Sequence, residues 1–105
     1  MITSRDVKLH KINGVAVASS LDIATHYKLD HQQLLTHIRK VRAAVSPEFK
    51  KRNFLDALTP DGQPFIWLTD DGFVVVAPKP KKGLNVTACH QAYIVAFIKA
   101  RHQAA

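Results

Sequence analysis

Two helix-start signals in close succession constrain the fold of this chain more than any other feature of its sequence. Ser19 opens a short apolar stretch and Asp22 follows three residues later, which is the spacing of a capping box. Asp30 then stands before a second, longer stretch as a good N-cap. The pattern predicts a short helix over 20–27 and a second helix over 31–45. Two helices joined by three or four residues are typical of a helix-turn-helix.

Extended segments flank this helix pair on both sides. An Asn-Gly dipeptide inside 9–18 predicts a β-hairpin, because both central positions of a type I′ turn need positive φ. A second hairpin is predicted around 59–63, in the position of a wing. The run 72–77 is too short for its periodicity to distinguish a strand from a helix. Residues 86–102 predict a terminal helix.

Composition places all of these elements in one domain of 105 residues. Fifteen Lys and Arg against eight Asp and Glu give a formal net charge of +7, which favours a polyanionic partner. The single cysteine, Cys89, excludes a disulfide framework within the chain and is expected to be a small buried hydrophobe. No segment has the charge and apolar pattern of a signal peptide or a membrane span, so we expect a cytoplasmic protein without membrane insertion.

The helix over 31–45 separates into two faces at about 100° per residue. Its core stripe is predicted to hold Leu34, Leu35, Ile38, Val41 and Val45. The opposite face is polar and cationic, without a carboxylate: Gln32, Gln33, Thr36, Arg39 and Lys40, with His37 at its edge. Gln can bind adenine edges, Arg can bind guanine edges and Thr can contact the thymine methyl group. A solvated face with accidental charge is the competing interpretation.

Further cations lie on both sides of this helix in the sequence. Lys28 precedes it, and the run Lys50, Lys51 and Arg52 follows it in a segment that could form a single turn starting at Ser46 or Pro47. These side chains are candidate phosphate ligands, although short basic runs are often only solvated. A proline-stiffened basic loop over 78–83 is a weaker candidate of the same kind.

Other candidate chemistry has a simpler explanation. His31 and His37 point about 120° apart on one helix, so they cannot chelate a metal, and His31 is expected to pack or cap. Asp70 and Asp71 before a glycine are typical of a turn or helix cap, and nothing supplies a nucleophile or base beside them. We therefore predict no enzymatic activity, no cofactor and no metal. Trp67, with Phe65, could stack on bases if exposed, but their alternation favours the core.

Four segments in order resemble the Rha family of phage and prophage regulatory proteins. They are "VASSLDIATHYKLDHQQLLTHIRKV", "SPEFKKRNF", "WLTDDGFVVVA" and "AYIVAF". The resemblance implies a small DNA-binding regulator of winged-helix type that acts in a bacterial host cell at the nucleoid. The chain departs from the family where a glycine at the helix-turn-helix corner is Lys28, which requires either a different turn or a positive φ costing roughly 1 kcal/mol. It also departs over 78–86, "PKPKKGLNV", where the family has a helix.

Together these features predict an α+β, winged helix-turn-helix domain over 1–105 that binds double-stranded DNA and regulates transcription. Its predicted DNA-binding residues are Gln32, Gln33, Thr36, His37, Arg39, Lys40, Lys28, Lys50, Lys51 and Arg52. The competing function is a protein-interaction module that uses its basic face to bind an acidic host protein. A homodimer through the C-terminal helix is possible if the hairpins leave Tyr93, Ile94, Phe97 and Ile98 uncovered.

Overall fold

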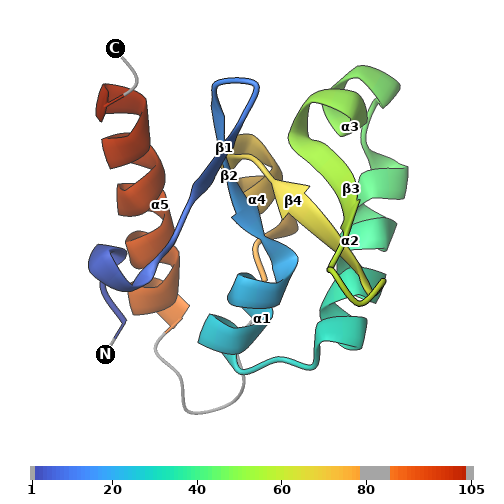
Figure 1. Ribbon diagram of the computed structural model, residues 1–105, viewed down its shortest axis with the longest axis horizontal. Coiled ribbons are helices and arrows are strands. Elements are labelled where there is room, and N and C mark those ends of the chain that lie inside the picture. The colour runs from blue at the N-terminus through green and yellow to red at the C-terminus, as the bar shows by residue number, and fades with distance from the viewer. Residues whose placement is uncertain (1, 79–85, 104–105) are drawn as a thin grey trace.

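A computed structural model describes residues 2–78 and 86–103 as one α+β domain (Figure 1). The elements in chain order are η1 (Ser4–Asp6), β1 (His10–Ile12), β2 (Val15–Ser19), α1 (Ser20–Tyr27), α2 (His31–Ala44), α3 (Pro47–Asn53), β3 (Phe54–Leu58), β4 (Pro64–Leu68), α4 (Asp70–Val76) and α5 (Val86–Gln103). The α+β class, both hairpins, the capped helix pair and the terminal helix agree with the sequence predictions.

The four strands form one antiparallel sheet in the order β1-β2-β4-β3. The first hairpin turns through Asn13 and Gly14, whose φ angles of 52° and 80° are those a type I′ turn requires. The strand before the helix pair, β2, pairs with the second strand of the later hairpin, with Ala18 opposite Leu68. This pairing brings together two strands that flank the helix pair α1 and α2 in the sequence.

The core lies between one face of the sheet and the helices. Ala18, Ile66 and Leu68 are the buried sheet residues at its centre. The helices contribute the largest fully buried side chains, which include Tyr27, Leu35, Ile38, Phe73, Tyr93 and Phe97. Cys89 is also buried in this core, as the sequence predicted.

The segment that follows β4 is helical, which resolves what periodicity could not decide. Thr69 caps α4 by accepting a hydrogen bond from the Gly72 N–H, and Asp70 and Asp71 occupy the first turn. The two aspartates therefore open a helix, as expected of such a pair. The predicted basic loop of Lys79, Lys81 and Lys82 lies outside the described residues.

The prediction that Phe65 and Trp67 are core holds in part: Phe65 is buried, but Trp67 is only half-buried, and neither joins the main core cluster. Ile66 and Leu68 are the β4 residues that face the helices, so period-two alternation places Phe65 and Trp67 on the other side of the sheet. Phe65 is nonetheless buried there and Trp67 is half-buried, with their ring centroids 5.0 Å apart. The sequence pattern gave the alternation correctly, but it could not tell which side the helices would cover.

Lys28 ends α1 in the left-handed region, with φ 54° and ψ 45°. Its N–H donates to Thr25 O, and the next N–H, of Leu29, donates to Ala24 O at 2.8 Å, so this conformation reverses the chain into α2. The sequence predicted either a different turn or a strained lysine here, and the structure has the strained lysine.

Lys28→Gly is expected to raise the free energy of unfolding by about 1 kcal/mol, because glycine has no Cβ to oppose a left-handed φ. Urea denaturation monitored by circular dichroism would measure the change. Lys28→Ala is the matched control: it removes the same charged side chain but keeps a Cβ. Equal stability of the glycine and alanine variants would show that backbone strain at this position is negligible.

Candidate nucleic-acid interface

The α1–α2 pair is fixed by caps at both of its helix starts. The Ser19 hydroxyl oxygen accepts from the Leu21 N–H at 3.0 Å. The Asp30 carboxylate accepts from the N–H groups of Gln32 and Gln33, at 2.8 and 3.2 Å. Asp30 thus satisfies two of the orphan donors at the start of α2. The chain reversal and these caps set the direction in which α2 leaves α1.

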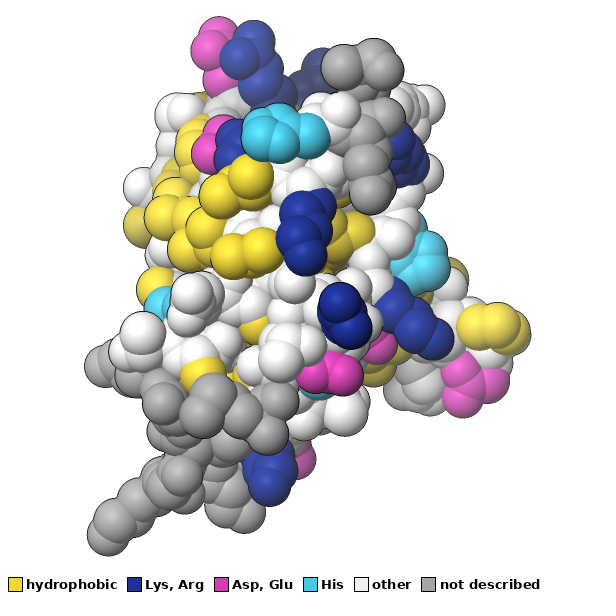
Figure 2. Space-filling model, turned by 90° about the vertical axis from the view of Figure 1, so that its left-hand side faces the viewer, with side chains coloured by type: hydrophobic (Ala, Val, Ile, Leu, Met, Phe, Trp, Pro, Cys, Tyr) yellow, Lys and Arg dark blue, Asp and Glu magenta, His cyan; other side chains and the backbone are white. Residues whose placement is uncertain are grey.

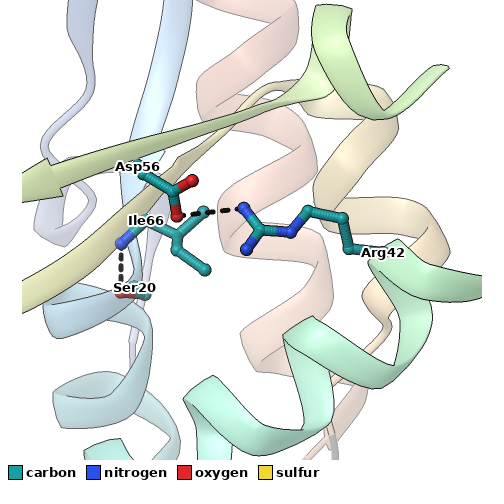
Figure 3. A network of polar contacts seen from close by, with 4 residues as sticks. All are labelled: Ser20, Arg42, Asp56 and Ile66. Carbon is teal, nitrogen blue, oxygen red and sulfur yellow. Dashed lines mark hydrogen bonds and ion pairs between the residues drawn. The ribbon is translucent and has the colours of Figure 1, made fainter. Parts of the chain in front are cut away.

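A buried hydroxyl joins both helices to the sheet (Figure 3). The Ser20 oxygen accepts from the Ile66 N–H at 3.0 Å, in the middle of β4. The same oxygen lies 2.9 Å from Nε2 of His31, in the first turn of α2. Burial lowers the pKa of His31, and Arg39 lowers it further while Asp30 opposes the shift. A neutral His31 can accept a hydrogen bond from the Ser20 hydroxyl group. His31 therefore holds α2 against α1, in line with the structural role predicted for it.

The other end of α2 is held by an ion pair with the second hairpin. Nη1 of Arg42 lies 3.0 Å from Oδ1 of Asp56 in β3, and Figure 3 shows both side chains reaching across the gap between helix and strand. Asp56 is largely exposed, so the pair fixes orientation more than it adds stability. The charge of Arg42 is therefore already paired within the protein, although Arg42 belongs to the same basic helix as Arg39 and Lys40.

The predicted DNA-contacting residues of α2 share one exposed face. We name Gln32, Gln33, Thr36, His37, Arg39 and Lys40 the outer face of α2, and all six are exposed. The predicted core stripe is confirmed on the opposite side: Leu34, Leu35 and Ile38 are buried, and Val41 and Val45 pack against the core. The helix ends at Ala44, one residue before the predicted boundary, with Val45 as its C-cap.

Two members of the outer face already hold hydrogen bonds within the protein. Nε2 of His37 lies 2.9 Å from the carbonyl oxygen of Val76, at the end of α4. The Thr36 hydroxyl donates to the Gln32 carbonyl oxygen at 3.0 Å. His37 therefore helps to hold α4 against α2, a role its sequence position at the edge of the face did not show. The amides of Gln32 and Gln33 and the charges of Arg39 and Lys40 make up the rest of the face.

Exposed cations lie at both ends of this face. Lys28 is exposed in the turn that leads into α2. Lys50, Lys51 and Arg52 form the last turn of α3, with Lys51 and Arg52 exposed and Lys50 half-buried. Figure 1 shows α3 at the C-terminal end of α2, so the fold places these cations beyond one end of the outer face and Lys28 beyond the other. Ser46 caps α3, accepting from the Phe49 N–H.

Helix α5 packs against α1 through two tyrosine–histidine contacts. The Tyr93 hydroxyl lies 2.6 Å from Nδ1 of His26, and the Tyr27 hydroxyl lies 2.6 Å from Nδ1 of His90. Burial raises the pKa of both tyrosines well above the usual range. Each hydroxyl group therefore stays protonated and can donate a hydrogen bond to the ring nitrogen. Adjacent residues of α1 thus bind residues one turn apart on α5. Nothing in the sequence paired these residues.

The second hairpin carries the opposite charge from the helices beside it. Residues 54–69 contain Asp56 and Asp61 and no lysine, arginine or histidine. Its turn is ordered by Thr59, whose N–H donates to Gln63 O and whose hydroxyl donates to the Asp61 carboxylate. The positive charge of this region therefore belongs to the α1–α2 turn, α2 and α3.

Among residues 2–78 and 86–103, three or more His, Cys, Asp or Glu side chains do not gather anywhere as a metal-binding group would. Helices in these described ranges are also too short or too polar to span a membrane. Searches against protein-family models, curated proteins and solved structures found no match for this chain.

Proposed function

We propose that this protein is a DNA-binding transcriptional regulator that inserts α2 into the major groove of double-stranded DNA. The observation that carries the proposal is the outer face of α2, whose six exposed side chains include two amides and two cations and no carboxylate. Amides and guanidinium groups are the side chains that bind base edges bidentately. The resemblance of the motifs to Rha-type phage regulators supports the regulatory role.

The arrangement of strands supports a winged helix-turn-helix as the specific architecture. The hairpin β3–β4 follows the helix pair and pairs through β4 with β2, the strand that precedes it. The Arg42–Asp56 ion pair ties this hairpin to α2. The hairpin would therefore accompany α2 onto DNA as a wing.

The charges suggest how contacts are divided within this proposal. We assign base edges to Gln32, Gln33, Thr36 and Arg39, and phosphates to Lys28, Lys40, Lys50, Lys51 and Arg52. The wing carries two aspartates and no cation, so it would orient α2 rather than neutralise phosphates.

A homodimer through α5 would present two copies of α2 to two half-sites. Ile94 and Ile98 remain exposed on α5, whereas Tyr93 and Phe97 are buried in the core. Figure 2 shows hydrophobic side chains gathered on the side of the molecule that α5 occupies.

The test is binding to random-sequence duplex DNA over a range of salt concentrations. We expect retention in a gel shift at low salt and its loss at high salt. Lys40→Ala should reduce the slope of log affinity against log salt by about one unit, because one phosphate contact accounts for about 0.9 of that slope. Lys11→Ala is the matched control, since Lys11 is an exposed lysine in β1, at the sheet edge opposite the wing.

Two results would contradict the proposal. An equal slope for Lys40→Ala and the unchanged protein would remove Lys40 from the phosphate contacts. No retention of duplex DNA at the lowest salt would overturn the function itself and favour the alternative, a basic module that binds an acidic host protein.

A further inference from the structure

A second surface of this protein, separate from the outer face of α2, combines an aromatic floor with cations. It is a hollow of about 200 Å³ between the β1–β2 turn and the end of α3. We name it the sheet groove, and its lining residues used below are Asn13, Val15, Lys51, Arg52, Leu55 and Trp67. Trp67 and Leu55 are directly opposite one another on β4 and β3, so they share one face of the sheet.

Trp67 lines this groove and packs against two other aromatic rings. Its ring centroid lies 4.9 Å from that of His10 and 5.0 Å from that of Phe65, the latter edge to face. Val15 and Leu55 also line the groove and are 49% and 47% exposed. A half-buried aromatic ring between exposed aliphatic side chains offers a flat apolar solute a place to stack.

The charge of the groove selects the kind of solute. Lys51 and Arg52 stand in its wall, and the described residues that line it include no aspartate or glutamate. Asn13 adds a polar side chain. The groove therefore complements a ligand that joins a flat apolar ring to an anionic chain, which is the chemistry of a base attached to a phosphodiester backbone.

The size of the groove indicates one base rather than a whole cofactor. Pockets for drug-sized ligands enclose about 300–1,000 Å³, which is more than this hollow offers. We propose that the sheet groove binds an unpaired base of a single-stranded nucleic acid, with Trp67 stacking on the base and with Lys51 and Arg52 binding the adjacent phosphates. The inference adds a second ligand to the proposed function and does not require α2 to bind duplex DNA.

Fluorescence measures this binding directly, because Trp67 is the only tryptophan of the chain. Titration of the full chain with oligothymidylate, whose bases are unpaired, is expected to quench the emission of Trp67 saturably. Leu55→Glu should weaken binding roughly tenfold or more, because it places a carboxylate beside the stacked base. Val74→Glu is the matched control: Val74 is 53% exposed, similar to Leu55, and lies on α4 outside the groove.

A second variant tests the inference even if Leu55→Glu fails to fold. Lys51→Gln with Arg52→Gln changes two exposed side chains and should lower the salt slope for oligothymidylate by about one unit or more. Arg39→Ala should leave the quenching unchanged while weakening duplex binding, which separates failure of this inference from failure of the proposed function.

Three results would overturn the inference. The first is no quenching by oligothymidylate at low salt, and the second is an equal affinity for Leu55→Glu and the unchanged protein. The third is thymidine triphosphate or polyglutamate binding as tightly as the oligonucleotide. Equal affinity for thymidine triphosphate would show that the groove binds a free nucleotide rather than a strand. Equal affinity for polyglutamate would show that the groove binds acidic chains without base stacking.

Discussion

A variant that carries Gln33→Ala and Arg39→Ala together is expected to lose at least about 30-fold of its preference for its selected duplex over random duplex. Each bidentate contact to a base edge contributes about 1–3 kcal/mol of discrimination. The two residues are six positions apart on α2, so their side chains stand roughly 9 Å apart along the helix axis and should contribute additively. Both are exposed, and neither belongs to the core that holds α2 in place.

The measurement first needs a preferred sequence, which selection from a random duplex library would supply. Affinities of the unchanged protein and the variant are then compared on that sequence and on random duplex at one fixed salt concentration. Lys40→Ala serves as the control for charge alone: it should weaken both duplexes about equally. A double variant that kept its sequence preference would show that other residues contact the base edges, with Gln32 and Thr36 the next candidates on the same face.

Gly72→Ala is expected to lower the free energy of unfolding by about 1–3 kcal/mol, the usual cost of forcing an extra carbon into a packed site. In most helices this substitution stabilises, because alanine has the higher helix propensity. Here a Cβ on Gly72 would lie 2.6 Å from the backbone oxygen of Asn53, an atom that cannot move away as a flexible side chain could. The sign of the effect is therefore reversed by the close approach of α3 and α4.

The Asn53 oxygen is fixed by a network that joins α3 to the start of α4. It accepts from the Thr69 N–H at 3.2 Å, while the Asn53 side chain accepts from the Thr69 hydroxyl at 2.6 Å and donates to Phe49 O at 2.9 Å. Asn53 is one of the few buried polar residues of the described chain. A shift to relieve the clash would strain these bonds, so the substitution should be costly even after relaxation.

Thermal unfolding monitored by circular dichroism would test this expectation. For a domain of this size, 1 kcal/mol corresponds to a change of about 4–8 °C in Tm. Val75→Ala, an exposed position in the same helix, is the control and should change Tm little. A Tm for Gly72→Ala equal to or above that of the unchanged protein would mean that α3 and α4 can separate without loss of stability.

The sequence by itself determined the features that depend on neighbours in the chain. Asn13 and Gly14 specified the first hairpin because few residues tolerate positive φ at both turn positions. Ser19 and Asp30 specified where α1 and α2 begin, because their side chains satisfy the N–H groups two or three residues onward. The two faces of α2 followed from helical periodicity alone, and so did the list of exposed polar residues on it.

Tertiary structure alone decided which of those residues have partners within the protein and which face of the sheet the helices cover. Arg42 is paired because β3 brings Asp56 to it, and His37 is bonded because α4 ends beside it. Trp67 lines a groove rather than the core because the helices cover the other face of the sheet. Local sequence sets helix starts and turns through contacts a few residues apart, whereas these partners are separated by ten or more residues. Only packing of the whole domain brings them together.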